Sequence, residues 1–394
     1  MELKILNIND LCTGCGACVN ICPRNCLELK PNDEGFYYPQ YDSRNCIECH
    51  LCEKACHILS SDEKKPISSE NFYMYASEDA EIRRNSSSGG CFSLIADYID
   101  KVGGVIFGSK YNGEDERLEV FDSNQYRWEG FRKSKYIESY TANAFVRVAQ
   151  YLSDSKVVFY CGTPCQIRGL YQFLKVKKIP IDNLFTADFI CHGVPSNKCF
   201  TEYKRQFERG NKKVVNVDFR HKDFTKKKRA WHNMVLRMDF SNNTSKVIPY
   251  KEPMYYGYYK VFMDNIILRR GCYNCYYPSV SCADFTFADF WGIYKYKPEI
   301  DDNTGISVVK LHTQKSIDLW NKLDVNSEKL SYSVVKYLYD KPDKRLLLSS
   351  RDAFFKDMKQ FGYMKATRKL YKKQLNKYYT IGWMTNLIKK LLKK

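Results

Sequence analysis

Nine of the 17 cysteines lie between Cys12 and Cys56, and eight of the nine repeat one pattern of spacing twice. Each repeat has three cysteines separated by two residues, followed by a fourth after three more. The two runs are Cys12, Cys15, Cys18 and Cys22, and then Cys46, Cys49, Cys52 and Cys56. In this arrangement the fourth cysteine of each run ligates the cluster of the other run. The spacing therefore predicts one four-iron cluster on Cys12, Cys15, Cys18 and Cys56, and a second on Cys46, Cys49, Cys52 and Cys22.

The doubled run resembles a bacterial-type ferredoxin with two 4Fe-4S clusters. Gly14 and Gly16 would let the backbone approach a cluster closely. Zinc also binds cysteine pairs, but a zinc site needs four ligands rather than two runs of four, so zinc is the weaker interpretation. His57 stands where proline usually follows the last cysteine, a departure that removes no ligand. Cys26 is predicted to be a small core residue.

Four cysteines further along the chain could hold a third cluster. Cys165 lies in the segment GTPCQ, Cys191 lies in CHGVPS, and Cys272 and Cys275 form a CxxC pair. Loops at the carboxyl ends of strands line the ligand crevice of an open α/β sheet, so Cys165 and Cys191 could face each other there. A disulfide-exchange site and buried core cysteines are the competing interpretations.

The segment Ser86-Ser87-Ser88-Gly89-Gly90 runs directly into a predicted helix. Small residues at a helix start offer N–H groups, hydroxyls and the positive end of the helix dipole, which suits a phosphate. An ordinary capped helix start explains the segment equally well. The chain has no GxGxxG fingerprint, and residues 103–110 do not match a P-loop, so simple dinucleotide and nucleoside-triphosphate sites lose support.

The elements that must position these residues alternate between helix and strand. This alternation indicates an α/β layer with parallel strands. The polar–apolar pattern of residues 214–220 and 234–240 suggests a more exposed antiparallel addition. The predicted strands are 105–107, 157–160 and 184–190, and the predicted helices are 92–102, 142–152 and 166–175.

Composition excludes several classes of protein. The chain has 394 residues, 44% hydrophobic and 15% aromatic, so it is neither disordered nor fibrous. No apolar run approaches the roughly 18 residues of a membrane span, and the first ten residues do not resemble a secretory signal. We therefore expect a cytoplasmic protein whose cysteines bind metal. The net charge is +18, but the sequence shows no recognised nucleic-acid-binding fold, so we expect no nucleic-acid partner.

Several motifs in one order resemble the coenzyme F420 hydrogenase/dehydrogenase beta-subunit family. They are SSSGG, SKY at 134–136, GTPCQIRGL, FICHGVPS, VDFRHK with the later Trp231, CYNC and ADFWG, between about residues 75 and 311. The resemblance implies a FAD-bearing flavoprotein and a cluster near the flavin, held by Cys165, Cys191, Cys272 and Cys275. The predicted FAD contacts are Ser86, Ser87, Ser88, Gly89, Gly90, Gly162, Thr163, Pro164, Gln166, Gly193 and Asp289. His192 is the candidate proton donor, because the ordinary pKa of a histidine side chain lies near neutrality.

We therefore predict an α+β or α/β protein with four parts. Residues 1–60 form the two-cluster ferredoxin domain, 61–74 a linker, 75–312 the mixed α/β FAD domain, and 313–394 a basic helical C-terminal region. The predicted function is an oxidoreductase that passes electrons from a donor such as reduced ferredoxin, through 4Fe-4S clusters, to FAD and a small organic acceptor, with the reductase direction favoured. The alternatives are an oxidoreductase of coenzyme F420 itself and a non-catalytic electron-transfer subunit.

The last fourteen residues predict a basic amphipathic helix. Leu387, Ile388, Leu391 and Leu392 recur at helical spacing with lysines between them. Such a helix could lie at the inner face of the membrane as a peripheral contact. Packing of the apolar stripe on the protein body is the slightly favoured alternative.

Overall fold

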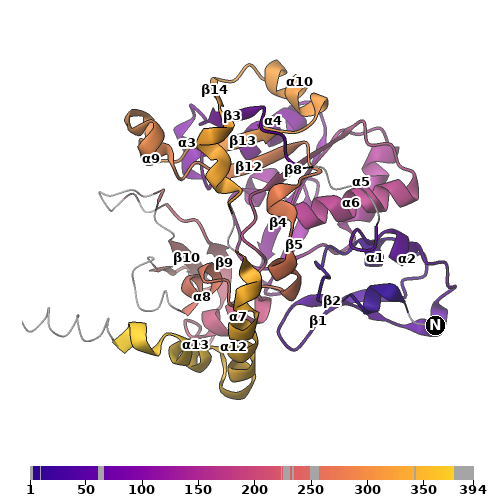
Figure 1. The fold of residues 1–394 in the computed structure, drawn as a ribbon, viewed down its shortest axis with the longest axis vertical. Helices are drawn as coiled ribbons and strands as arrows, with labels where there is room; N and C mark the ends of the chain where they lie inside the picture. The colour runs from indigo at the N-terminus through magenta and orange to yellow at the C-terminus, as the bar shows by residue number, and fades with distance from the viewer. Residues whose placement is uncertain are drawn as a thin grey trace, which may run out of the picture.

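A nine-stranded mixed sheet forms the centre of the molecule, and the N-terminal cysteines lie on a small module beside it (Figure 1). The structure, a computed structural model, describes residues 3–8, 10–60, 66–222, 224, 231–232, 235–248, 257–340 and 343–376. This mixed α/β architecture with an N-terminal ferredoxin-like region confirms the predicted fold class.

The N-terminal module contains one hairpin and two short α-helices, together with two 3-10 helices at Lys4–Leu6 and Ser43–Asn45. Strands β1 (Leu27–Pro31) and β2 (Tyr37–Tyr41) pair antiparallel, and helices α1 (Ala17–Asn20) and α2 (Leu51–Lys54) each begin inside a cysteine run. Gly14 has a φ angle of 71°, in the left-handed region that favours glycine. The first cysteine run can therefore turn tightly.

The central sheet has the strand order β14-β3-β13-β12-β8-β7-β4-β5-β6. Its four middle strands β12, β8, β7 and β4 pair in parallel, and β5 pairs parallel with β6, while the remaining pairs are antiparallel. The strands are β3 (Phe72–Tyr75), β4 (Val105–Asn112), β5 (Arg117–Asp122), β6 (Ser139–Tyr140), β7 (Val158–Cys161), β8 (Leu184–Phe189), β12 (Phe285–Asp289), β13 (Ser307–Leu311) and β14 (Ser327–Leu330). The parallel centre confirms the predicted strands 105–107, 157–160 and 184–190.

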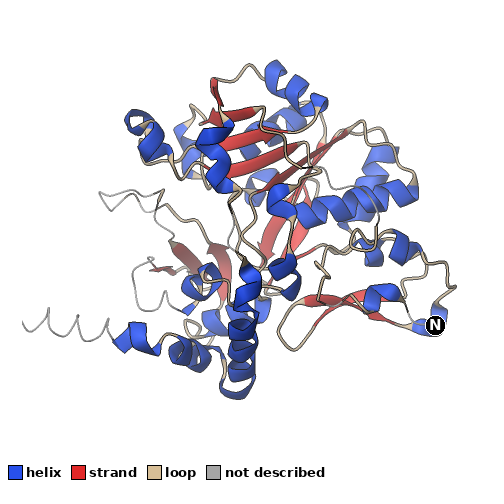
Figure 2. Ribbon diagram, in the orientation of Figure 1, coloured by secondary structure: helices blue, strands red, loops and turns tan. Residues whose placement is uncertain are grey.

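Helices cover both faces of this sheet (Figure 2). Neighbouring strand residues point to opposite faces, so Ile106 and Phe159 pack with α4 (Cys91–Lys101) and α10 (Gln314–Lys322), whereas Phe107 and Tyr160 pack with α5 (Ala144–Ser153) and α6 (Pro164–Lys177). The predicted helices 92–102, 142–152 and 166–175 correspond to α4, α5 and α6. The other α-helices are α3 (Ala80–Arg84), α7 (Asn197–Arg205), α8 (Tyr259–Met263), α9 (Ile293–Tyr296), α11 (Tyr332–Val335), α12 (Leu348–Phe361) and α13 (Tyr363–Leu370).

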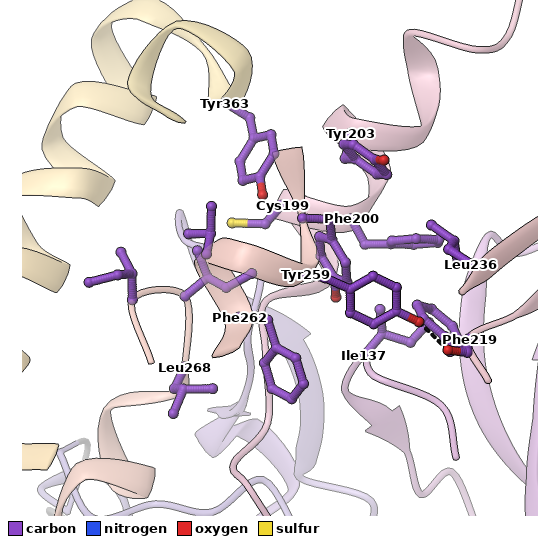
Figure 3. Packing of buried hydrophobic residues seen from close by; sticks show 14 of the residues in the cluster. Ile137, Cys199, Phe200, Tyr203, Phe219, Leu236, Tyr259, Phe262, Leu268 and Tyr363 are labelled. Atoms are coloured by element: carbon purple, nitrogen blue, oxygen red, sulfur yellow. Dashed lines mark hydrogen bonds between the residues drawn. The ribbon is translucent and has the colours of Figure 1, made fainter. Parts of the chain in front are cut away.

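A second, smaller sheet builds a separate core. Strands β9 (Val214–Asp218), β10 (Leu236–Phe240) and β11 (Ser245–Ile248) pair antiparallel, as the polar–apolar pattern predicts. Figure 3 shows side chains of α7, α8 and α13 gathered beside this sheet, with the Tyr259 hydroxyl donating to the Phe219 carbonyl oxygen. This core supports the chain that leads from α8 to the CxxC pair.

The N-terminal module shares its core with the central domain. Leu3, Ile5, Ala17 and Ile21 are buried in the same hydrophobic cluster as the inner sides of α5 and α6. Burial of apolar side chains contributes roughly 25 cal/mol per Å² removed from water. The module is therefore packed against the central domain rather than tethered to it.

Two segments predicted to lie outside the FAD domain contribute strands to the central sheet. Residues 72–74 of the predicted linker belong to β3, and β14 lies within the predicted C-terminal region and pairs with β3. The C-terminal region thus combines helices with an edge strand, and the proposed division into domains stays a prediction. The basic helix expected at 381–394 lies outside the described residues. Where the chain is described, no helix has both the length and the apolar composition of a membrane span.

Candidate iron–sulfur and cofactor site

The inner cysteine set, which consists of Cys12, Cys15, Cys18 and Cys56, is a close group of half-buried cysteines. Burial raises the pKa of the Cys18 thiol well above its usual value, and the thiols of Cys15, Cys12 and Cys56 raise it further, with the smallest contribution from Cys52 of the second run. Burial also raises the pKa of Cys15 to about 12, again with contributions from Cys56 and Cys12. Thiolates that repel one another in this way lie close together. The structure brings together the four cysteines predicted for one cluster.

The outer cysteine set, which consists of Cys22, Cys46, Cys49 and Cys52, is more open. Burial raises the pKa of Cys52 to about 11, and the neighbouring Cys22 adds to the shift. The pKa of Cys46 is instead lowered, because the Tyr41 side chain hydrogen-bonds to its sulfur. Cys49 is exposed. The outer set therefore has one face that solvent or another protein can reach.

The third cysteine set, which consists of Cys165, Cys191, Cys272 and Cys275, lines a cavity of about 350 Å³. Burial raises the pKa of Cys165 well above its usual value, and the other three thiols of the set raise it further. The backbone N–H of Val194 donates to the Sγ of Cys272 at 3.4 Å, which suits a thiolate ligand. The loops after β7 and β8 meet the CxxC pair here, as the parallel strands require.

Helix α6 joins the third set to the inner set. Cys165 lies in its first turn, and Gly169 follows four residues later, so one helical turn of about 6 Å separates them. A Cβ atom added to Gly169 would lie 2.7 Å from the Sγ of Cys15. The helix can pass this close to the inner set because residue 169 has no side chain.

His57 also connects the two regions. Its Nε2 contacts the Thr13 hydroxyl at 3.0 Å, and its Nδ1 contacts the Tyr277 hydroxyl at 3.1 Å. The histidine is 3% exposed. The residue that replaces the usual proline thus ties the loop of Cys12 to the segment that follows Cys275.

The donor chemistry of all three sets fits four-iron clusters. Across the described ranges, no three His, Cys, Asp or Glu side chains converge on a point where one metal ion could be held. A four-iron cluster bonds each thiolate to a different iron, so its ligands need not converge on one point. Grouped but separated thiols are what such a cluster requires.

A much larger cavity of about 1090 Å³ lies next to the third set. This volume suits a large organic cofactor. The predicted residues that line it are Ser86, Ser87, Ser88, Gly90, Gly162, Thr163, Gln166, His192, Gly193 and Asp289. Two predicted contacts do not line it. Pro164 lines the cavity of the third set, and the N–H of Gly89 donates to the Ser307 hydroxyl at 2.8 Å.

The serines before α4 already have protein partners. The Ser86 hydroxyl donates to the Ile82 carbonyl oxygen at 2.7 Å, the Ser87 hydroxyl contacts Ser134 at 3.1 Å, and the Ser88 hydroxyl donates to the backbone just before β13. The serines therefore shape this loop, while Gly90, Cys91 and Phe92 place the start of α4 in the cavity wall.

The residues Thr163, Pro164 and Gln166 form a helix N-cap. The Gln166 N–H donates to the Thr163 hydroxyl at 3.4 Å, and the Gln166 side chain accepts from the Thr163 N–H at 3.0 Å. This capping box, with proline at the first helical position, fixes the start of α6. The cap holds Cys165 in place whether or not these residues contact a cofactor.

Sequence reasoning did not identify the cationic side chains of the large cavity. Arg132, Lys133, Lys135 and Arg220 line it. Arg220 is paired with Asp289 at 2.7 Å, and burial lowers the pKa of Lys135 to about 7. Two of these residues, Lys135 and Arg220, lie in the motifs SKY and VDFRHK. The basic residues of these motifs could have indicated a cationic cavity wall. The cavity wall therefore carries basic side chains, two of them already paired with acids: Arg220 with Asp289, and Lys133 with Asp218 at 2.6 Å.

His192, the candidate proton donor, lies at the boundary of the large cavity. Its ring packs edge-on against Phe262 with centroids 4.9 Å apart, and the ammonium of Lys344 donates to its carbonyl oxygen. The side chain is half-buried. Its position suits contact with a bound molecule, and its role as a proton donor stays a prediction.

The two cavities share a wall. Thr13, Phe189, Ile190, Cys191, Gly193 and Val194 line both of them. Cys191 belongs to the third set, and Thr13 belongs to the loop of the inner set. A group bound in the large cavity would therefore lie next to the third set.

Two segments of the chain match known protein families. Residues 155–333 match the family described as the C-terminal part of the coenzyme F420 hydrogenase/dehydrogenase beta subunit. Residues 11–58 match the 4Fe-4S dicluster domain.

Two proteins and one solved structure are similar to parts of this chain. An uncharacterized ferredoxin from Methanocaldococcus jannaschii is 34% identical over 14% of this chain and 71% of its own length. One component of the H(2):CoB-CoM heterodisulfide,ferredoxin reductase of Methanothermobacter thermautotrophicus is 42% identical, but the match spans 12% of this chain and 9% of that protein. A chain of the F420-reducing [NiFe] hydrogenase complex from Methanosarcina barkeri matches 74% of this chain and 96% of its own length, with 14% identity and a TM-score of 0.47.

Proposed function

This chain belongs to the coenzyme F420 hydrogenase/dehydrogenase beta-subunit family and carries a 4Fe-4S dicluster domain at its N-terminus, and from this premise we propose that it is an iron–sulfur flavoprotein oxidoreductase. Electrons enter from a donor such as reduced ferredoxin, pass through the cysteine sets and leave through FAD to a small organic acceptor. The chain is thus an electron-transfer protein of an oxidoreductase-type family, and the flavin, the third cluster and the direction are the parts proposed here.

The observation that carries the proposal is the shared wall between the two cavities. Cys191 lines both the cavity of the third set and the large cavity. One turn of α6 separates Cys165 from the residue that contacts Cys15. The third set therefore borders the large cavity, and one turn of α6 joins it to the inner set.

The chain's own residues suit FAD in the large cavity. FAD accepts electrons singly and delivers them as a pair, which is the conversion that clusters cannot perform. Arg132, Lys133 and Arg220 provide positive charge for its pyrophosphate, and the start of α4 adds its helix dipole. The half-buried His192 is the proposed proton donor to the acceptor.

A second candidate function is electron transfer within a larger complex, with catalysis on another protein. Cys275 of the third set is exposed, like Cys49 of the outer set, so protein partners could exchange electrons at either end. The family description also keeps coenzyme F420 as a candidate acceptor. A purified chain that reduces no small molecule but copurifies with a catalytic partner would favour this second function.

Cofactor analysis after anaerobic purification tests the proposal. Three cubanes require about twelve iron and twelve sulfide per chain, together with one FAD. The Cys272→Ser variant should lose about four iron, whereas Cys282→Ser, which alters a half-buried cysteine that we assign no ligand role, should retain the full content. About eight iron in the wild type would remove the third cluster, and zinc in place of iron would overturn the whole proposal.

A further inference from the structure

A buried arginine lies between the inner set and the third set. Arg269 has no exposed surface. Its backbone carbonyl oxygen accepts from the Cys272 N–H at 2.9 Å, so its main chain braces the third set. Its side chain extends in the other direction, where Nε donates to the Cys12 carbonyl oxygen at 2.7 Å and Nη2 approaches the Cys12 Sγ at 3.6 Å. One residue thus contacts both cysteine sets.

The guanidinium of Arg269 is held in one orientation. Its Nη1 pairs with the buried carboxylate of Glu138, and Nη2 also donates to the Tyr37 carbonyl oxygen at 2.6 Å. The Tyr38 ring lies 4.2 Å from the guanidinium carbon. A Cβ atom on Gly14 would lie 2.7 Å from Nη1. The ion pair therefore lies directly on the backbone of the inner cysteine run.

Charge and hydrogen bonding near a cluster sulfur set its reduction potential. A reduced cluster carries one more negative charge than the oxidised form. A guanidinium that donates to a ligand sulfur in a dry interior stabilises that charge strongly, because the local dielectric is low. The Glu138 carboxyl group, which pairs with the guanidinium and lies against Gly14 of the same cysteine run, acts in the opposite direction when it is ionised.

We propose that Arg269 is a positioning residue that raises the reduction potential of the inner cluster and holds it against the third cysteine set. The side chain makes the inner cluster the preferred acceptor of an electron that arrives at the outer set. This inference rests on the dicluster domain. It does not depend on FAD or on the third cluster, so it stands if either of those proposals fails.

Redox titration of the full reconstituted chain, followed by electron paramagnetic resonance of the reduced clusters, tests this role. The inner signal is the one that Cys12→Ser alters. Arg269→Gln should lower the midpoint potential of the inner cluster by at least about 59 mV, which corresponds to a tenfold change in the one-electron reduction equilibrium. Glu138→Gln should raise the same potential, since it removes the opposing charge.

Arg351 provides a matched control. It is also fully buried, and it pairs with Glu34 of the β1–β2 hairpin, so it fastens the same module to α12. Arg351→Gln should leave the inner potential unchanged. An unchanged inner potential in Arg269→Gln with full iron content would overturn the proposal, as would an equal shift in Arg351→Gln. If Arg269→Gln loses the inner cluster, Glu138→Gln decides alone, and an unchanged or lower potential there would overturn the proposal.

Discussion

The inner and outer cysteine sets repeat one spacing in the sequence but have different surroundings. The inner set lies beneath α6, where residue 169 must be glycine to clear Cys15, and beside the buried Arg269. The outer set includes the exposed Cys49, and the neighbouring Ile47 is 55% exposed. Two clusters with the same ligands would therefore differ in potential and in access.

We infer from this difference that electrons enter the module at the outer set and leave it at the inner set. A cluster that solvent can reach exchanges electrons with partners, whereas a cluster enclosed by protein passes them inward. The enclosure comes from the central domain and not from the ferredoxin sequence, because Gly169 and Arg269 lie far along the chain. The same module in isolation would lose the asymmetry.

The largest expected effect breaks the inner set alone. Gly169→Ala places a Cβ atom 2.7 Å from the Cys15 Sγ, so the chain should lose about four iron and the inner resonance signal while it keeps the outer one. In an exposed helix the same change from glycine to alanine would increase stability by up to about 1 kcal/mol, so a loss would come from the contact and not from helix propensity. Gly130→Ala, whose Cβ would meet only Lys110 at 3.6 Å, is the control. Full iron content in Gly169→Ala would contradict the tight contact.

A second comparison uses access to solvent. When the oxidised protein is exposed to a chelator, the outer cluster should be lost several-fold faster than the inner cluster, because Cys49 is exposed. Iron release and the decay of the two resonance signals would be followed together. Equal rates, or earlier loss of the inner signal, would show that the central domain does not protect the inner set.

A third comparison separates the large cavity from both cysteine sets. Arg220→Gln should weaken FAD binding by roughly ten- to a hundredfold, since a hydrogen bond to a charged group contributes about 1.5–3 kcal/mol. The clusters should be unaffected. Arg237→Gln removes a more exposed arginine that is also paired with an aspartate, at 2.8 Å, and should bind FAD normally. Flavin titration measures both variants, and equal affinity would move the phosphate site away from Arg220.

The sites differ in how far their residues and contacts can be predicted from the sequence. The inner and outer sets follow from local spacing, because each run wraps one loop. The third set follows from strand order, because parallel strands bring the loops of Cys165 and Cys191 to one edge. The pair of Arg269 with Glu138 and the contact of Gly169 with Cys15 could not be predicted, since each joins segments more than 100 residues apart. Gly89 and Pro164 were predicted contacts, but backbone packing and helix capping account for their positions.

The smallest expected effect concerns a half-buried histidine outside both ferredoxin sets. Burial, assisted by Lys310, lowers the pKa of His312 to about 3. The folded state therefore favours the neutral ring, so its contribution to stability is complete above the unfolded pKa of about 6.5 and is lost as the pH falls toward 3. Each pH unit below 6.5 should cost up to about 1.4 kcal/mol. Between neutral and mildly acidic pH, the thermal unfolding temperature of the wild type should fall more steeply than that of His312→Gln. Parallel plots of unfolding temperature against pH would contradict the lowered pKa.

The most direct test of the proposed electron path, from the outer and inner sets through the third set to FAD, is a single anaerobic turnover of the full chain with reduced ferredoxin as the donor. Rapid mixing would follow flavin bleaching optically and cluster reduction by freeze-quench resonance. We predict that the wild type reduces the outer and inner clusters before the flavin, and that Cys272→Ser still reduces both clusters but reduces its flavin many-fold more slowly. Flavin reduction at the wild-type rate in Cys272→Ser would show that electrons do not pass through the third cysteine set.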